Sequence, residues 1–108
     1  MINTKNKDIE ILLSYIRGNQ NTKCLDIDTK SKLNYLYDEI MSFENKIPSI
    51  EKMNELQKIE IELETNCEDL YELGNYFDPV FIRMKNLIYK NNVLKLREKN
   101  RKKRAMNL

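Results

Sequence analysis

The chain has 108 residues, of which 33% are charged and 41% hydrophobic, and its formal net charge is +2. This length provides one modest hydrophobic core and excludes a second domain. There is no His, no Trp, and only 2 Gly and 2 Pro. The chain therefore lacks the side chain best suited to proton transfer near neutral pH, and the scarcity of turn residues disfavours a many-stranded sandwich or barrel.

The first predicted helix covers residues 7–17. Its apolar side chains recur at positions i, i+3, i+4 and i+7, which is the spacing of one helical face. These residues are Ile9, Leu12, Leu13 and Ile16. Asn6 is the expected N-cap, and Gly18 is expected to end the helix.

A second helix is predicted to run to about residue 45, with Asp28 or Thr29 as its N-cap. Its apolar stripe consists of Leu33, Leu36, Tyr37, Ile40 and Phe43. Pro48 blocks continuation of this helix, and Ser49 is the expected N-cap of the next one.

From residue 50 to residue 74 or 75 the apolar spacing alternates between three and four residues, as in a coiled-coil seam. The seam positions are Leu56, Ile59, Leu63, Asn66, Leu70, Leu73 and Phe77. The polar position, Asn66, has three interpretations. In the first, Asn66 is buried and fixes the register or the number of chains in an oligomer. In the second, water enters the seam at this position. In the third, Cys67 is buried instead and Asn66 turns outward.

Asp78 and Pro79 predict the start of a final helix, with Asp as the cap and Pro in the first turn. Its inner face is expected to contain Val80, Phe81, Met84, Leu87, Ile88, Asn91 and Leu94. We therefore predict an all-α fold, a small bundle of about four helices with a long, coiled-coil-like C-terminal hairpin. Residues 1–94 form a single helical domain, and residues 95–108 form a basic C-terminal extension.

Positive charge is concentrated at the end of the chain. Residues 95–104 contain seven Lys or Arg against one Glu, a net charge of +6, which leaves −4 for the rest. The basic residues are Lys95, Arg97, Lys99, Arg101, Lys102, Lys103 and Arg104. Three interpretations are open. These residues contact phosphates, either of nucleic acid or of an anionic membrane surface, or they form a solvated helix end. In the third, they dock onto an acidic protein, which includes a second copy of this chain.

Negative charge is concentrated in residues 55–78, which hold eight Asp or Glu against one Lys, a net charge of −7. Helical spacing sorts six of these carboxylates into two rows, Glu60, Glu64 and Glu68 in one and Glu55, Glu62 and Asp69 in the other. Metal-binding bundles combine such carboxylates with histidines. Because this chain has no His, we interpret both rows as solvated faces and predict no metal site.

No motif in the sequence predicts catalysis or a cofactor. The pair Asp26 and Asp28 has a spacing that can hold Mg²⁺, but no phosphate or calcium loop follows, so we interpret Asp28 as a cap and Asp26 as a solvated turn residue. Cys24 and Cys67 have no histidine to activate them. A single disulfide between them is compatible with the sequence, although a reducing environment is the expected setting. We therefore predict no catalytic residues.

The exposed apolar seam favours a non-enzymatic helical interaction protein, which is an adaptor, an assembly subunit or an inhibitor. It would bind a protein partner or a second copy through the surface of residues 56–81. The expected contacts are Leu56, Ile59, Leu63, Asn66, Leu70, Leu73, Tyr76, Phe77 and Phe81. The alternative is a nucleic-acid-associated factor that uses residues 95–104 for phosphate contacts.

Two further expectations concern the tyrosines and the compartment. Tyr71 and Tyr76 either close the hairpin by packing or anchor an interface. No apolar run approaches the roughly 20 residues of a transmembrane helix. The first residues also lack the features of a secretory signal, so the cytoplasm, or the nucleus of a eukaryote, is the expected location.

Overall fold

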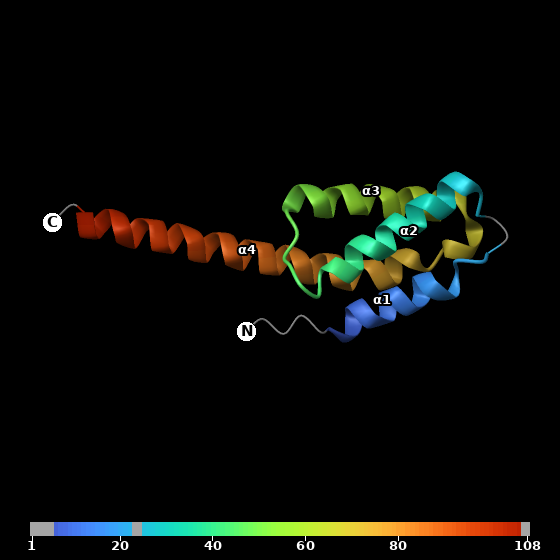
Figure 1. Cartoon of the computed structure of the whole chain (residues 1–108), viewed down its shortest axis with the longest axis horizontal. Helices are drawn as coiled ribbons and strands as arrows, with labels where there is room; N and C mark the ends of the chain where they lie inside the picture. The colour runs from blue at the N-terminus through green and yellow to red at the C-terminus, as the bar shows by residue number, and fades with distance from the viewer. Residues whose placement is uncertain (1–5, 23–24, 107–108) are drawn as a thin grey trace.

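The computed structural model describes residues 6–22 and 25–106, with side chains described as far as Lys99. Within these ranges the chain forms four α-helices and no strand. The helices are α1 (Lys7–Gly18), α2 (Ile27–Ser42), α3 (Ile50–Asn66) and α4 (Leu73–Met106), with a short 3₁₀ turn, η1 (Glu68–Leu70), between the last two. Consecutive α-helices run antiparallel (Figure 1). The prediction of an all-α bundle with a long C-terminal helix is confirmed.

Polar caps fix the starts of α1 and α3. The side-chain oxygen of Asn6 accepts the amide N–H of Asp8 at 3.0 Å, and Ser49 Oγ accepts the amide N–H of Lys52 at 3.1 Å. Both caps satisfy amide groups that have no partner within the helix. Both were predicted from the sequence and are confirmed.

The predicted cap of α2 is wrong. Asp26 is the N-cap, and its side chain accepts the amide N–H of Thr29 at 2.7 Å. Because this hydrogen bond stabilises the ionised form, it lowers the pKa of Asp26. Asp28 lies in the first turn and pairs with Lys32 at 3.1 Å. Both carboxylates of the Asp26–Asp28 pair therefore have structural partners.

The long helix expected over residues 50–74 is interrupted, so its predicted boundary is wrong. Cys67 is extended, with φ −140° and ψ 110°, and it ends α3. After η1 the chain enters α4 at Leu73, before the start expected at Asp78. Gly74 and Pro79 lie inside α4. Pro79 is the seventh residue of α4, past the first turn, and it has no amide hydrogen to donate to the carbonyl of Asn75.

The core is formed by one apolar face of each helix. α1 packs against α2 and α4, and α3 packs against α2 and α4, which closes a ring of four helices. The buried hydrophobic residues are Ile9, Leu12, Leu13, Ile16, Leu33, Leu36, Ile40, Phe43, Met53, Leu56, Leu63, Cys67, Leu70, Leu73, Phe77, Val80, Phe81, Met84 and Ile88. This core accounts for the apolar stripes that the sequence shows on all four helices.

α4 continues well beyond the bundle (Figure 1). As far as Lys99, where the described side chains end, its last buried side chain is Ile88, and every side chain from Tyr89 onward is exposed or half-buried. We call residues 89–106 the α4 extension. It gives the molecule a length of 67 Å against widths of 23 and 19 Å. Among the helices of the described ranges, none combines the length and apolar composition needed to cross a bilayer.

Candidate interaction surface

Most of the side chains predicted to contact a partner lie in the chain's own core. Six of them are between 0% and 8% exposed: Leu56, Leu63, Leu70, Leu73, Phe77 and Phe81. Ile59 and Tyr76 are half-buried, and Asn66 is exposed. The seam is therefore covered by helices of the same chain, and the six buried side chains are not accessible to a partner while the bundle is folded.

The buried seam of α3 follows a different register from the predicted one. Its buried positions are Met53, Leu56, Glu60, Leu63 and Cys67, again spaced by three and four residues. Glu60 and Cys67 take the places expected for Ile59 and Asn66. The interpretation in which Cys67 is buried and Asn66 turns outward is confirmed.

Cys67 is 1% exposed and disulfide-bonded. The other cysteine of the chain, Cys24, lies outside the described residues. A sulfur atom in a disulfide is not a thiolate nucleophile. Cys67 therefore contributes to the core and to covalent cross-linking.

The aromatic residues near the start of α4 separate into two groups. The ring of Tyr76 stacks on that of Tyr15 in α1, with centroids 4.6 Å apart. Tyr15 also donates its hydroxyl hydrogen to the carbonyl of Asp69 at 3.4 Å, and burial raises its pKa. Tyr71 is 73% exposed. Tyr76 thus packs α4 against α1, while the Tyr71 ring remains accessible.

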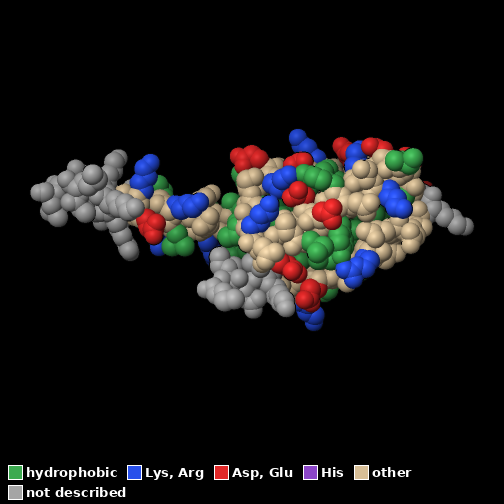
Figure 2. Space-filling model, in the orientation of Figure 1, with side chains coloured by type: hydrophobic (Ala, Val, Ile, Leu, Met, Phe, Trp, Pro, Cys, Tyr) green, Lys and Arg blue, Asp and Glu red, His purple; other side chains and the backbone are tan. Residues whose placement is uncertain are grey.

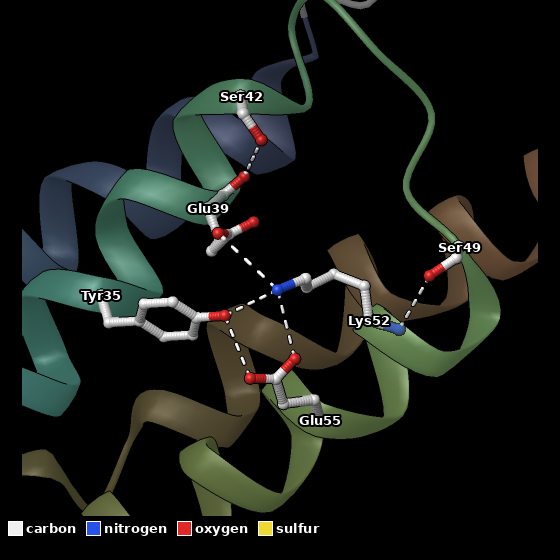
Figure 3. Close-up of polar contacts among 6 residues, drawn as sticks. All are labelled: Tyr35, Glu39, Ser42, Ser49, Lys52 and Glu55. Atoms are coloured by element: carbon white, nitrogen blue, oxygen red, sulfur yellow. Dashed lines mark hydrogen bonds and ion pairs between the residues drawn. The ribbon is translucent and has the colours of Figure 1, made fainter.

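A polar cluster joins α2 to the first turn of α3 (Figure 3). Lys52 Nζ donates to the Tyr35 hydroxyl at 2.6 Å, and it lies 3.2 Å from a Glu55 oxygen and 3.8 Å from a Glu39 oxygen. The Tyr35 hydroxyl in turn donates to Glu55 at 3.0 Å. Each polar side chain of the cluster has at least one partner within it.

The electrostatics of this cluster oppose a catalytic role. The hydrogen bond with Tyr35, followed by the one with Glu55, raises the pKa of Lys52, so its ammonium group keeps its proton. The same contacts, with Lys52 first, lower the pKa of Glu55. A catalytic lysine would need the opposite shift to act as a nucleophile or base near neutral pH. The cluster therefore stabilises the α2–α3 contact.

One acidic row is not a solvated face, so that prediction is wrong for Glu60. Its side chain is 4% exposed, and burial followed by a hydrogen bond with Glu64 raises its pKa to about 8. Glu64 is half-buried and accepts the amide N–H of Gly74. The sequence contained a signal for this, since Glu60 follows Leu56 by four residues and precedes Leu63 by three.

A second apolar stripe, which was not predicted from the sequence, runs along the solvent side of α4. We call it the outer stripe: Ile82, Tyr89, Val93 and Leu96, at intervals of seven, four and three residues. Ile82 and Leu96 are each 59% exposed and Tyr89 is 71% exposed. Leu94, expected on the inner face, is also 59% exposed because the bundle ends before it.

Basic side chains lie on several faces of the same part of α4, and Lys95 borders a hollow on the bundle side together with Ile88. Lys85, Lys90, Lys95, Arg97 and Lys99 are all exposed. On the face shown in Figure 2, hydrophobic and basic side chains lie next to one another along the projecting part of α4. The side chains of the other predicted phosphate contacts, Arg101, Lys102, Lys103 and Arg104, lie outside the described side chains, although the backbone of α4 is helical through them.

The described residues offer little for small-molecule chemistry. In this part of the chain, no three His, Cys, Asp or Glu side chains are placed to hold a metal ion together. A hollow of about 500 Å³ lies between α1 and α4, lined by Lys7, Glu10, Ile11, Ser14, Tyr15 and Tyr76. Its lining combines the opposite charges of Lys7 and Glu10 with the rings of Tyr15 and Tyr76.

Comparison of the chain with protein-family models, with curated proteins and with solved structures found no match.

Proposed function

We propose that the chain is a non-enzymatic interaction protein, an adaptor, assembly subunit or inhibitor, that binds an acidic protein surface through the outer stripe and the α4 extension. The observation that carries this proposal is the exposure of Tyr89 and Leu96 on one face of a helix that has left the bundle. Exposed apolar side chains gathered on one element typically mark an interaction site.

This proposal moves the binding surface away from residues 56–81. The six buried seam residues could meet a partner only if α3 and α4 separated. By contrast, the outer stripe is available in the folded chain, and its spacing suits a helix that lies along an apolar groove. An acidic rim around that groove would pair with the Lys and Arg side chains of the same helix.

Charge argues against two α4 extensions binding each other side by side. Residues 89–99 contain four Lys or Arg and one Glu, a net charge of +3, so two copies would repel. A partner of opposite charge removes this repulsion and gains association rate from electrostatic steering. A homo-oligomer remains an outcome that the experiment below can detect.

Nucleic acid is the second candidate, and one specific observation favours it. α4 is continuous through residues 95–104, so its basic residues follow one helix. Phosphate contacts of this kind would make binding strongly salt-dependent. The exposed leucines at positions 94 and 96 would gain nothing from phosphates, which is why we place the protein partner first.

Two variants separate the candidates. The first replaces Leu94 and Leu96 by Ser, and the second replaces Lys95, Arg97 and Lys99 by Gln. All five positions lie beyond the last buried side chain, so we expect both variants to fold. Asn92→Ser is the control, because it changes an exposed polar residue on the same segment.

Protein partners are sought by affinity purification from a lysate, and nucleic-acid binding is measured with labelled DNA and RNA. The solution mass is measured by light scattering at two salt concentrations, with and without nuclease. We expect the Leu variant and the cation variant each to lose the same protein partner, while the control keeps it. Loss in the cation variant alone, with nuclease-sensitive mass, would instead establish nucleic-acid binding. A partner retained by the Leu variant, or a mass that doubles without any partner, would overturn the protein-partner proposal.

The expected cytoplasmic or nuclear location remains a proposal. The described residues of the α4 extension contain no cysteine, so the redox state of the compartment does not alter them. The proposed role of the α4 extension is therefore the same in either location.

A further inference from the structure

The buried position of Glu60 calls for an explanation that an interaction role does not supply. Glu60 lies in the seam of α3 between Leu56 and Leu63, and only 4% of its surface is exposed. An ionised carboxylate in such a position is costly unless it is paired with a cation or well hydrogen-bonded. Its neighbours therefore decide its charge.

Among the described side chains, none of the charged groups that act on Glu60 is a cation. The charged groups that act on it are Glu64 on its own helix and Asp78 on α4, and both are acidic. On α2, Lys32 pairs instead with Asp28 and Glu62, at 3.1 and 2.9 Å. The intervening turn η1 adds two more acidic residues and no basic one.

The absence of a side chain at Gly74 makes room for the two carboxyl groups. A Cβ atom on Gly74 would lie 2.6 Å from an oxygen of Glu64 and 2.8 Å from an oxygen of Glu60. The Gly74 amide, in the first turn of α4, donates its hydrogen to Glu64. A carboxylate at this place satisfies an amide with no partner within the helix and lies at the positive end of the helix dipole.

Two carboxyl groups that share a hydrogen bond must hold a proton between them. Glu64 accepts from the α4 amide and also interacts with Glu60 through a side-chain hydrogen bond. The two groups hold one proton between them, and we place it on Glu60, which is the more deeply buried of the two. If both were ionised, two negative charges would lie together in a largely dry contact, with Asp78 adding a third.

We propose that Glu60, Glu64 and Gly74 form a pH-sensitive switch at the contact between α3 and the beginning of α4. The contact is closed while the two carboxyl groups share a proton. Loss of that proton drives the carboxyl groups apart, removes the cap from the first turn of α4 and loosens its packing on α3. This device is independent of the proposed partner.

The direction of the pH effect follows from the proton count. The ordinary pKa of Glu60 is 4.5, and in the folded chain it is raised to about 8. Between these values the folded chain holds a proton that the unfolded chain has released, so stability falls as pH rises. The stabilising contribution is complete below about pH 4.5 and is lost as the pH rises through about 8.

The test compares thermal unfolding of the full chain with that of Glu60→Gln at pH values from 5 to 9. Gln keeps the shape and can donate a hydrogen bond to Glu64, but it cannot ionise. We expect the wild-type midpoint to fall by about 5 °C or more over this range, while the Gln variant changes far less. Glu51→Gln, an exposed acid on the same helix, is the control and should keep the wild-type pH dependence.

A second measurement keeps the inference testable if Glu60→Gln fails to fold. The carboxyl carbon of Glu60 in the wild-type chain can be titrated by NMR, together with hydrogen exchange at the Gly74 amide, corrected for the intrinsic pH dependence of exchange. We expect Glu60 to titrate near pH 8 and the protection of Gly74 to fall over the same interval. Titration near the ordinary value, or equal pH dependence in the wild type and the Gln variant, would overturn the switch.

Discussion

Gly74 is the single residue whose substitution bears most directly on the contact between α3 and α4. In Gly74→Ala the new Cβ would lie within 3 Å of both carboxyl oxygens, so Glu60 and Glu64 must move. Moving Glu64 breaks its hydrogen bond to the α4 amide, which we expect to cost about 1–2 kcal/mol. Chemical denaturation at pH 6 measures the net change, in which the higher helix propensity of alanine offsets up to about 1 kcal/mol of this loss.

The matched experiment for Gly74→Ala is a double-mutant cycle with Glu64→Ala. Without the Glu64 carboxyl group, the closer of the two contacts disappears, and the added methyl group should become neutral or stabilising because alanine favours the helix over glycine. Equal effects of Gly74→Ala in both backgrounds would show that Glu64 is not the group displaced.

The hydrophobicity of each residue also explains which buried positions of the seam could be predicted from the sequence. Leu56, Leu63 and Leu70 belong to both the expected and the observed register, and all three are buried. The positions between them were ambiguous, because Ile59 and Glu60 are adjacent and only one can point inward. Hydrophobicity favoured Ile59. The space beside Gly74, which is created by a residue from another helix, favours Glu60 and cannot be recognised from periodicity.

At the scale of elements, the starts of α1 and α3 could be predicted because their caps are local. Asn6 and Ser49 act through amides two or three residues away. The end of α3 could not be predicted, since residues 67–72 contain no Gly or Pro. This break depends on Cys67, which is extended, buried and disulfide-bonded. These are tertiary and covalent constraints, and local propensity does not contain them.

The Tyr35 cluster provides a prediction about how α2 and α3 are held together. Tyr35→Phe removes a hydroxyl group that accepts from Lys52 and donates to Glu55. The ring still packs against the core, so only the polar contacts change. We expect the free energy of unfolding to fall by about 1 kcal/mol, as measured by urea denaturation.

Tyr89→Phe is the matched control for this prediction. Tyr89 lies on the α4 extension with 71% of its surface exposed, so removing its hydroxyl group should leave stability unchanged. An equal loss in the two variants would mean that the α2–α3 cluster contributes nothing specific.

At the scale of the whole molecule, the structure separates a closed bundle from an exposed helical extension. The sequence predicted the concentration of positive charge at the end of the chain, because charge can be read directly. The outer stripe escaped prediction because its residues are widely spaced and interrupted by Lys and Asn side chains. Only the position of α4 in the bundle shows that Ile82 and Leu96 point away from the core.

This separation predicts that the bundle folds without most of the α4 extension. A chain ending at Leu94 keeps all the side chains that the structure describes as buried, so we expect a cooperative thermal transition and a change in unfolding free energy below about 1 kcal/mol. A chain ending at Asn86 is the contrasting variant, because it lacks Ile88, which is 7% exposed, and should lose about 1.5–3 kcal/mol. Circular dichroism during heating measures both. If ending the chain at Leu94 destabilised it as much as ending it at Asn86, the extension would be part of the folded core and not a free binding element.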